Sequence, residues 1–483
     1  MTNSIICVIL GSDNKQMNTT AYFEERTDSM KYTFKRNFYK ELISGIQNYF
    51  ITALLGPRKC GKTVALLQLN EELPLSKYYD AKMMREADQN ALYTAILKSI
   101  QNNEEVTYII DELTYINSAD LFVEGIAVES RRYRTTNVHI VFTGSQSFAI
   151  KSWIGKSFSS CAKYVFADFI NYSEWLLYKQ YDKATEENYI EFLINVDKFY
   201  NMDSLCMYLH TCLEETVISN YHSVNLILNN NVDDLNEQVL LDVLFATLVT
   251  LHNHTSYAKF RSNDMLYNAL RFSYPEACQS HVEDIRDIVD KYYATFSRLN
   301  IQTIIQALIF LSNCKLIRLF EVGEEKTFGD LEAILTSYSS DEKKAKIFTK
   351  ESLFRSINVT IAHPMFFIAL VKEALGFDES MKLSGSLLGG IVECHCRGLL
   401  PTNAFEFQTV VNDVDREIDY VNPDKGIAVE FTISNNHGEC FDLLAGEYAC
   451  VRLSQSLRTS WQTDKGKMVQ CLPYYEFIAQ LSK

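Results

Sequence analysis

Eight consecutive residues, fitting the pattern G-x-x-x-x-G-K-[S/T], constrain the fold of this chain more than any other feature. They are Gly56, Pro57, Arg58, Lys59, Cys60, Gly61, Lys62 and Thr63. An apolar stretch precedes them and a helical pattern follows, which predicts a strand, a phosphate-binding loop and a helix. Glycines in such a loop let backbone N–H groups turn inward around an anion at a helix N-terminus. A chance match in an ordinary strand–helix turn is the alternative, but the flanking elements favour a nucleotide site.

The lysine and the threonine of this motif have defined roles at a nucleoside triphosphate. Lys62 is expected to reach the β- and γ-phosphates, and the hydroxyl of Thr63 to ligate Mg²⁺. The motif therefore predicts a triphosphate and Mg²⁺ as cofactors. No residue of the motif distinguishes ATP from GTP.

A second apolar stretch, VTYIIDEL, ends in Asp111 and Glu112. At the end of a parallel strand, Asp111 is expected to hold Mg²⁺ through water, and Glu112 to orient and deprotonate the attacking water. The alternative is a strand with two solvated acids at its end. We assign the catalytic roles to Glu112 and Lys62, and the metal-binding roles to Asp111 and Thr63.

A third apolar stretch, VHIVFTGS, ends in Thr143 and Ser145. Either hydroxyl could sense the γ-phosphate, and a turn that caps the strand is an equally plain alternative. We place Ser145 in the cofactor site. A basic stretch before this strand offers three arginines that could serve as an arginine finger or bind phosphates of nucleic acid, and a solvated helix face is the competing interpretation. They are Arg131, Arg132 and Arg134.

The pattern of elements predicts an α/β protein with several domains. Apolar runs without alternation, separated by helices, favour a parallel sheet covered on both faces. Residues 171–285 have apolar residues at helical spacing and no strand pattern. Residues 286–380 suggest helices followed by short strands, a winged-helix-like order, and the last hundred residues return to mixed α/β structure. We predict an N-terminal segment (1–45), a P-loop core (46–170), a helical lid (171–285), a winged-helix-like region (286–380) and a C-terminal domain (381–483).

Composition narrows the class of partner. The net charge of −15 argues against a wholly basic nucleic-acid-binding protein, although a local basic groove is compatible with it. No run approaches the roughly 18 apolar residues needed to cross a membrane, and the first ten residues lack the features of a signal peptide. The 12 cysteines are scattered, which favours reduced thiols in a cytoplasmic protein. The Cys394-His395-Cys396 triplet has no second pair at zinc-finger spacing.

These stretches resemble a known family. LLGPRKCGKTVALLQL, YIIDEL and VFTGSQS are similar to the AAA-type P-loop ATPases of bacteria and archaea, many of which carry a C-terminal nuclease domain of the PD-(D/E)XK type. IIQALIFLSNCKLIRL resembles the winged helix of that family, and REIDYVNPDKGIAVEFTIS resembles its nuclease core. The resemblance covers roughly residues 45–440. It implies ATP as the nucleotide and a restriction-nuclease-like α/β fold at the C-terminus.

The resemblance also implies a nuclease site built from acids around one or two Mg²⁺ ions. Its acids here are Glu393 on a helix, then Asp419 with Glu417 beside it, then Glu430. Asp419 and Glu430 are the expected metal ligands. Thr432 stands where the family has a lysine, and Lys425 in the neighbouring turn is the nearest substitute.

Another departure from the family lies before the predicted lid. Many relatives carry an arginine-glycine-arginine turn there, whereas this chain offers Lys163 as a stand-in. Fast intrinsic hydrolysis is therefore not expected.

Three functions fit these residues. The first is an ATPase that acts as a conformational switch and controls the nuclease-like domain. The second is an ATP-regulated, Mg²⁺-dependent DNA nuclease, and the third is an ATP-gated scaffold for DNA or a protein partner with an inactive nuclease-like domain. The resemblance leaves a homo-oligomer open, because AAA-type ATPases often form rings that share an arginine across subunits.

Overall fold

The computed structural model describes most of the chain in two compact units, divided between Ala167 and Asp168. The described ranges are 34–134, 136–158, 161–200, 204–218, 235–250, 298–326, 356–375, 385–412, 414–431 and 440–482, with scattered positions between 287 and 433. Most of the predicted N-terminal segment and residues 251–285 of the predicted lid lie outside them. No helix among the described residues is long and apolar enough to cross a membrane.

The first unit is built on a five-stranded sheet in the order β2-β3-β4-β1-β5, and every neighbouring pair is parallel. The strands are β1 (Ile51–Leu55), β2 (Ser76–Asp80), β3 (Val106–Asp111), β4 (Val138–Thr143) and β5 (Ala162–Phe166). All residues of β1 and β3 are buried, which explains their unbroken apolar runs. The predicted parallel sheet is therefore confirmed.

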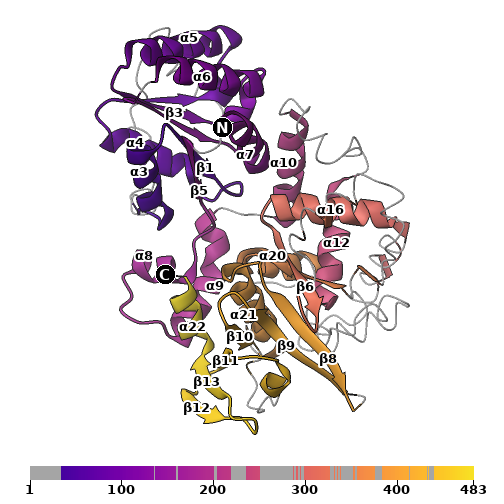
Figure 1. The fold of residues 1–483 in the computed structure, drawn as a ribbon. Coiled ribbons are helices and arrows are strands. Elements are labelled where there is room, and N and C mark those ends of the chain that lie inside the picture. Colours follow the sequence, from indigo (N-terminus) through magenta and orange to yellow (C-terminus); the bar gives the residue numbers. More distant parts are fainter. Residues whose placement is uncertain are drawn as a thin grey trace. The chain divides into compact units, whose positions relative to one another are not determined.

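Helices cover both faces of this sheet (Figure 1). They are α3 (Phe38–Asn48), α4 (Lys62–Glu72), α5 (Glu86–Asn102), α6 (Ala119–Tyr133) and α7 (Ser147–Phe158), with short 3₁₀ helices η2 (Ala81–Met83) and η3 (Leu113–Tyr115). One apolar core joins α5, α6 and α7 to the sheet through residues such as Ile96, Val123 and Ile150. Right-handed crossovers place α4 on the opposite face, because its connection from β1 to β2 runs the other way along the strand order.

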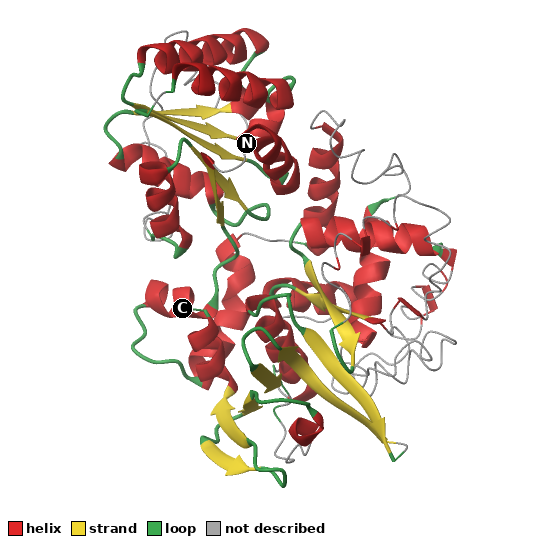
Figure 2. Ribbon diagram, viewed as in Figure 1, coloured by secondary structure: helices red, strands yellow, loops and turns green. Residues whose placement is uncertain are grey.

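The second unit contains an eight-stranded mixed sheet in the order β12-β13-β11-β10-β9-β8-β6-β7. Its strands are β6 (Ile317–Gly323), β7 (Ile357–Ile361), β8 (Phe405–Val411), β9 (Val414–Asn422), β10 (Ile427–Glu430), β11 (Ala449–Ser454), β12 (Thr459–Gln462) and β13 (Met468–Pro473). Its helices are α8 (Tyr172–Lys179), α9 (Glu186–Tyr200), α10 (Leu205–Ile218), α12 (Glu237–Thr250), α16 (Ile301–Asn313), α20 (Pro364–Leu375), α21 (Gly385–Leu399) and α22 (Tyr474–Leu481), with η7 (Cys440–Leu443). Figure 2 shows the helices of this unit beside its long strands.

The winged-helix-like region does not stand apart from the C-terminal sheet. The predicted helix followed by short strands is present as α16, β6 and β7, and β6 pairs with β7 in antiparallel register. The other edge of β6 pairs in parallel with β8, so the predicted boundary at residue 380 separates strands of one sheet. This pairing joins segments about 80 residues apart, and local sequence patterns carry no signal for which strand completes an edge.

Candidate functional site

The carboxyl ends of β1, β3 and β4 bring the predicted nucleotide residues together. Because these strands are parallel, their carboxyl ends lie at one edge of the sheet, with β4 between β1 and β3. The motif loop follows β1, Glu112 follows β3, and Ser145 lies two residues after β4. In open α/β sheets, ligands bind outside this edge.

The loop needs glycine at two positions for different reasons. The φ angle of Gly56 is +153°, and a Cβ there would lie 2.0 Å from the carbonyl oxygen of Ala167. Gly61 has a φ angle of +97° and precedes the first residue of α4. The loop thus delivers backbone N–H groups at a helix N-terminus, where anions bind.

Lys62 is the first residue of α4, and its side chain is buried beneath the loop. Its Nζ donates to the carbonyl oxygens of Gly56 (2.9 Å) and Pro57 (2.6 Å). Its ammonium therefore lies inside the turn that a phosphate would occupy. The ammonium has three N–H donors on a flexible side chain, so these donors can turn from the carbonyl oxygens to phosphate oxygens.

Asp111 and Thr63 lie together, as the magnesium assignment requires. Asp111 is only 2% exposed, and it accepts hydrogen bonds from the hydroxyls of Tyr78 (2.9 Å) and Thr63. Burial raises the pKa of Asp111, although the bonds from Thr63 and Tyr78 act in the opposite direction. A carboxylate and a hydroxyl are oxygen ligands of the kind that Mg²⁺ prefers, so these residues fit that ion.

Glu112 is held against the turn that follows β4. It has a φ angle of +54°, and its carboxylate accepts from the backbone N–H of Ser145 (3.1 Å) and from the Ser145 hydroxyl (3.0 Å). The carboxylate of Asp111 accepts from the N–H of Glu112 at 3.0 Å. The expected water-activating acid and the expected sensor hydroxyl are therefore direct neighbours.

The two hydroxyls at the end of β4 have different partners. The hydroxyl of Thr143 is buried and donates to the carbonyl oxygen of Leu54 at 2.6 Å, so it ties β4 to β1. The capping alternative describes Thr143, whereas Ser145 faces the acid.

Three residues contact the site without having been predicted. The hydroxyl of Ser147 lies 2.8 Å from the N–H and 3.1 Å from the carbonyl oxygen of Gly56. Arg36, just before α3, donates to the carbonyl oxygen of Cys60 at 3.1 Å, and Tyr78 bonds Asp111 from β2. Ser147 belongs to the VFTGSQS stretch and could have been found there. No sequence signal connects Arg36 or Tyr78 to the motif.

The candidate arginine fingers lie near the amino ends of the strands, whereas the P-loop lies at their carboxyl ends. Helix α6 starts beyond the carboxyl end of β3 and returns to where β4 begins, so its last turn is remote from the loop. Arg131 donates to the carbonyl oxygen of Ser157 (2.8 Å), and Arg132 pairs with Glu129 (3.6 Å). The finger interpretation is therefore wrong for the chain's own P-loop. Lys163 lies in β5 opposite Thr52, and its ammonium is 3.8 Å from the carboxylate of Glu41.

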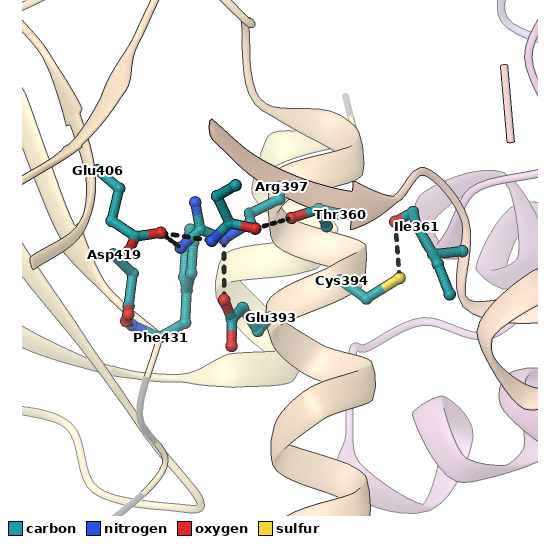
Figure 3. Close-up of polar contacts among 9 residues, drawn as sticks. Thr360, Ile361, Glu393, Cys394, Arg397, Glu406, Asp419 and Phe431 are labelled. Atoms are coloured by element: carbon teal, nitrogen blue, oxygen red, sulfur yellow. Dashed lines mark hydrogen bonds and ion pairs between the residues drawn. The ribbon is translucent and has the colours of Figure 1, made fainter. Parts of the chain in front are cut away.

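The second unit contains a buried cluster of charges around α21 (Figure 3). Arg397 is fully buried; its Nε donates to Glu393 (2.9 Å) and its Nη2 to Glu406 (2.8 Å). Burial alone would lower the pKa of Arg397, but the carboxylates of Glu393, Glu406 and Asp419 outweigh it and raise the pKa. Sequence reasoning named Glu393 and missed both Arg397 and Glu406.

The other predicted nuclease residues differ in their burial and in their neighbours. Asp419 is buried in β9 and accepts from the N–H of Phe431 at 2.5 Å. Glu430 ends β10 in register with Arg452 of β11, and Glu417 is in register with Gln408 of β8. Lys425 is exposed in the turn between β9 and β10. Thr432 lies outside the described residues.

The Cys394-His395-Cys396 triplet is packed inside the same unit. The thiol of Cys394 donates to the carbonyl oxygen of Ile361 (2.9 Å), and His395 is hydrogen-bonded to the hydroxyl of Tyr189 (3.0 Å). Burial raises the pKa of the Cys394 and Cys396 thiols and lowers that of His395. These side chains join α21 to α9 and β7.

Comparison with known proteins supports the assignment of the first unit. Residues 48–176 match a protein-family model described as an AAA domain, a range that contains the loop, Asp111, Glu112 and Ser145. Among solved structures, the chain is similar to a Walker-type ATPase of Pyrococcus abyssi at 15% identity and a TM-score of 0.33, over 65% of this chain and 97% of that chain. A search of curated proteins finds no match. The family match and the geometry of the site together identify an AAA-type P-loop domain.

Proposed function

We propose that this chain binds ATP with Mg²⁺ at its P-loop and hydrolyses it, and that the nucleotide cycle is a conformational switch controlling the nuclease-like second unit. One observation carries the hydrolytic part of the proposal. Glu112 is bonded to Ser145 and adjoins Asp111, which is bonded to Thr63 of the P-loop. An acid for water, a hydroxyl for the phosphate and oxygen ligands for a cation thus converge at one edge of the sheet.

Each residue has a separate task in this proposal. The N–H groups of the loop and the ammonium of Lys62 bind the phosphates, and the hydroxyl of Ser145 contacts the γ-phosphate. Glu112 orients the attacking water and accepts its proton. Thr63 and Asp111 would hold Mg²⁺, which when bound neutralises charge on the phosphates. Movement of Ser145 toward the γ-phosphate would release the carboxylate of Glu112, so binding and activation are coupled.

The second unit admits two outputs for such a switch. An ATP-regulated DNA nuclease requires acids with free oxygens around a metal ion. A scaffold that binds DNA or protein requires only that the unit change its contacts. The bonds of Arg397 to Glu393 and Glu406 favour the scaffold, because they place a cation against the helix acid and occupy one of its two carboxylate oxygens.

Phosphate release by the wild type and by Glu112→Gln tests the proposal. We expect the variant to keep its affinity for ATP and to lose hydrolysis by about 10²–10⁴-fold, because the amide cannot accept the proton of water. Glu124→Gln is the matched control, since it makes the same chemical change at an exposed position on α6. Hydrolysis by Glu112→Gln at the rate of the Glu124→Gln control would contradict the proposal.

The same reactions with duplex DNA, analysed on a gel, separate the two outputs. Hydrolysis that DNA stimulates, together with cleavage that disappears in Asp419→Ala, would establish the nuclease. Hydrolysis with intact DNA, with Mg²⁺ or Mn²⁺, would leave the scaffold. Salt-sensitive binding of intact DNA would then identify nucleic acid as its partner, because phosphate contacts release counterions.

A further inference from the structure

Arg397 occupies the centre of the buried charges in the second unit. Its guanidinium forms ion pairs with two carboxylates, those of Glu393 and Glu406. Glu393 lies one helical turn earlier on α21, and Glu406 lies in β8. The ion pairs therefore connect the helix to the middle of the sheet.

Aromatic rings and acidic side chains surround the guanidinium, although its Nη1 is buried without a hydrogen-bond partner among the described residues. The rings of Phe320 and Phe431 each lie 5.5 Å from its central carbon, a distance at which aromatic faces attract a cation. The amide of Asn358 donates to the second partner, Glu406, at 2.5 Å. Asp419 adds a third negative charge close enough to act on Arg397. A planar group with several donors matches carboxylates in this arrangement better than an ammonium would.

The residues present do not fit the metal ion that the nuclease resemblance implies. A catalytic Mg²⁺ needs several carboxylate oxygens that converge and remain free to coordinate it. Here one oxygen each of Glu393 and Glu406 accepts from the guanidinium, and one oxygen of Asp419 accepts from the N–H of Phe431. Glu430, the other expected ligand, ends β10 in register with Arg452 of β11. Within the described residues, no group of three or more Asp, Glu, His or Cys side chains is arranged to hold a metal.

We propose that Arg397 is the permanent counter-cation of Glu393, Glu406 and Asp419, and that the second unit folds and acts without a divalent metal. The guanidinium provides the positive charge that a metal ion supplies in a metal-dependent nuclease. Unlike a metal, it is covalently part of α21 and cannot be exchanged or removed by a chelator. This inference does not depend on ATP hydrolysis, because it concerns residues of the second unit alone.

Buried charge makes the proposal sensitive to substitution. Three buried carboxylates need a cation, and removing one partner of a buried ion pair leaves uncompensated charge. Arg397→Met retains a long apolar side chain but removes the charge. Replacing Glu406 by Gln in the same chain removes one of the stranded charges, so the double variant should recover part of the lost stability.

The first experiment measures metal binding by the full chain carrying Asp111→Asn, without nucleotide, so that the P-loop lacks its acidic metal ligand. We expect no stoichiometric binding of Mn²⁺ by calorimetry or electron paramagnetic resonance. We also expect the same thermal unfolding profile in EDTA and in Mn²⁺. One equivalent of bound Mn²⁺ that disappears on adding Asp419→Asn would overturn the proposal.

The second experiment compares thermal unfolding of Arg397→Met with that of Arg458→Met, which removes an exposed ion pair with Glu476 in the same unit. We expect the Arg397 variant to unfold about 5–10 °C lower than wild type and the control to change by less than about 2 °C. Equal effects in the two variants would overturn the proposal. If Arg397→Met does not fold, Arg397→Lys, which keeps the charge, should fold with a smaller loss of thermal stability. If both Arg397 variants fail to fold while Arg458→Met folds, the shape of the side chain rather than its charge is required, and the proposal is overturned.

Discussion

Both units gather acidic side chains, but they surround them with different partners. In the first unit Asp111 and Glu112 are bonded to hydroxyl and N–H groups, chiefly those of Thr63, Tyr78 and Ser145. In the second unit Glu393 and Glu406 are bonded to the guanidinium of Arg397. The first set is hydrogen-bonded to neutral donors at the carboxyl ends of parallel strands, and the second to a cation that is fully buried.

This difference separates a site that can accept a ligand from one that already contains its counter-charge. Glu112 is only half-buried, and moving Ser145 from Glu112 to a phosphate oxygen breaks hydrogen bonds to a neutral donor but no ion pair. Removing the guanidinium from Glu393 and Glu406 would leave buried carboxylates without compensation. Acid spacing in the sequence therefore identifies where carboxylates gather, and their hydrogen-bonding partners decide whether the place is a reaction site.

The largest effect in this comparison is expected on ATP affinity when Lys62 of the first unit is replaced. Lys62→Ala should weaken ATP binding by about 10–100-fold, because it removes charge-assisted hydrogen bonds to the phosphates. Calorimetry or displacement of a fluorescent nucleotide measures the change. Lys98→Ala, an exposed lysine on α5, is the matched control and should bind ATP as the wild type does. Unchanged affinity in Lys62→Ala would break the contrast and refute the P-loop assignment.

A smaller effect is expected from the hydroxyls at the end of β4. Ser145→Ala should lower the rate of hydrolysis by about 10-fold, since it removes a contact to Glu112 and to the γ-phosphate. Thr143→Val should leave the rate within about 2-fold of wild type but lower the thermal midpoint, because the carbonyl oxygen of Leu54 loses its partner. Reversed effects in the two variants, by kinetics and calorimetric unfolding, would show that Thr143 is the sensor.

The smallest effect concerns Arg36, which contacts the P-loop, in comparison with Arg397 of the second unit. Arg36 is partly exposed and makes a hydrogen bond to the carbonyl oxygen of Cys60, whereas Arg397 is fully buried between two acids. Arg36→Ala should weaken ATP binding by about 3–10-fold through the loop and change the thermal midpoint little. A fall in stability as large as that expected for Arg397→Met would remove the distinction between an arginine that supports the loop and one that balances buried acids.

The parallel sheet and the P-loop of the first unit could be predicted from sequence because their signals are local. The pattern Gly56–Thr63 needs only one turn, and the apolar strands that end in Asp111 and Thr143 announce a parallel sheet whose carboxyl ends meet. The roles of Arg36 and Tyr78 escaped notice, because neither contact follows from spacing along the chain.

The second unit shows the limit of the same method. The acids Glu393 and Asp419 could be named from their resemblance to a nuclease core, and α16, β6 and β7 were expected as a helix with short strands. The sequence could not show that β6 pairs with β8, nor that Arg397 lies between Glu393 and Glu406. By itself, the sequence predicted the P-loop, the acids beside it and the order of elements, because each depends on neighbouring residues. Only the tertiary structure decided which cation faces which acid, because hydrogen bonds and burial between distant segments arise when the chain packs.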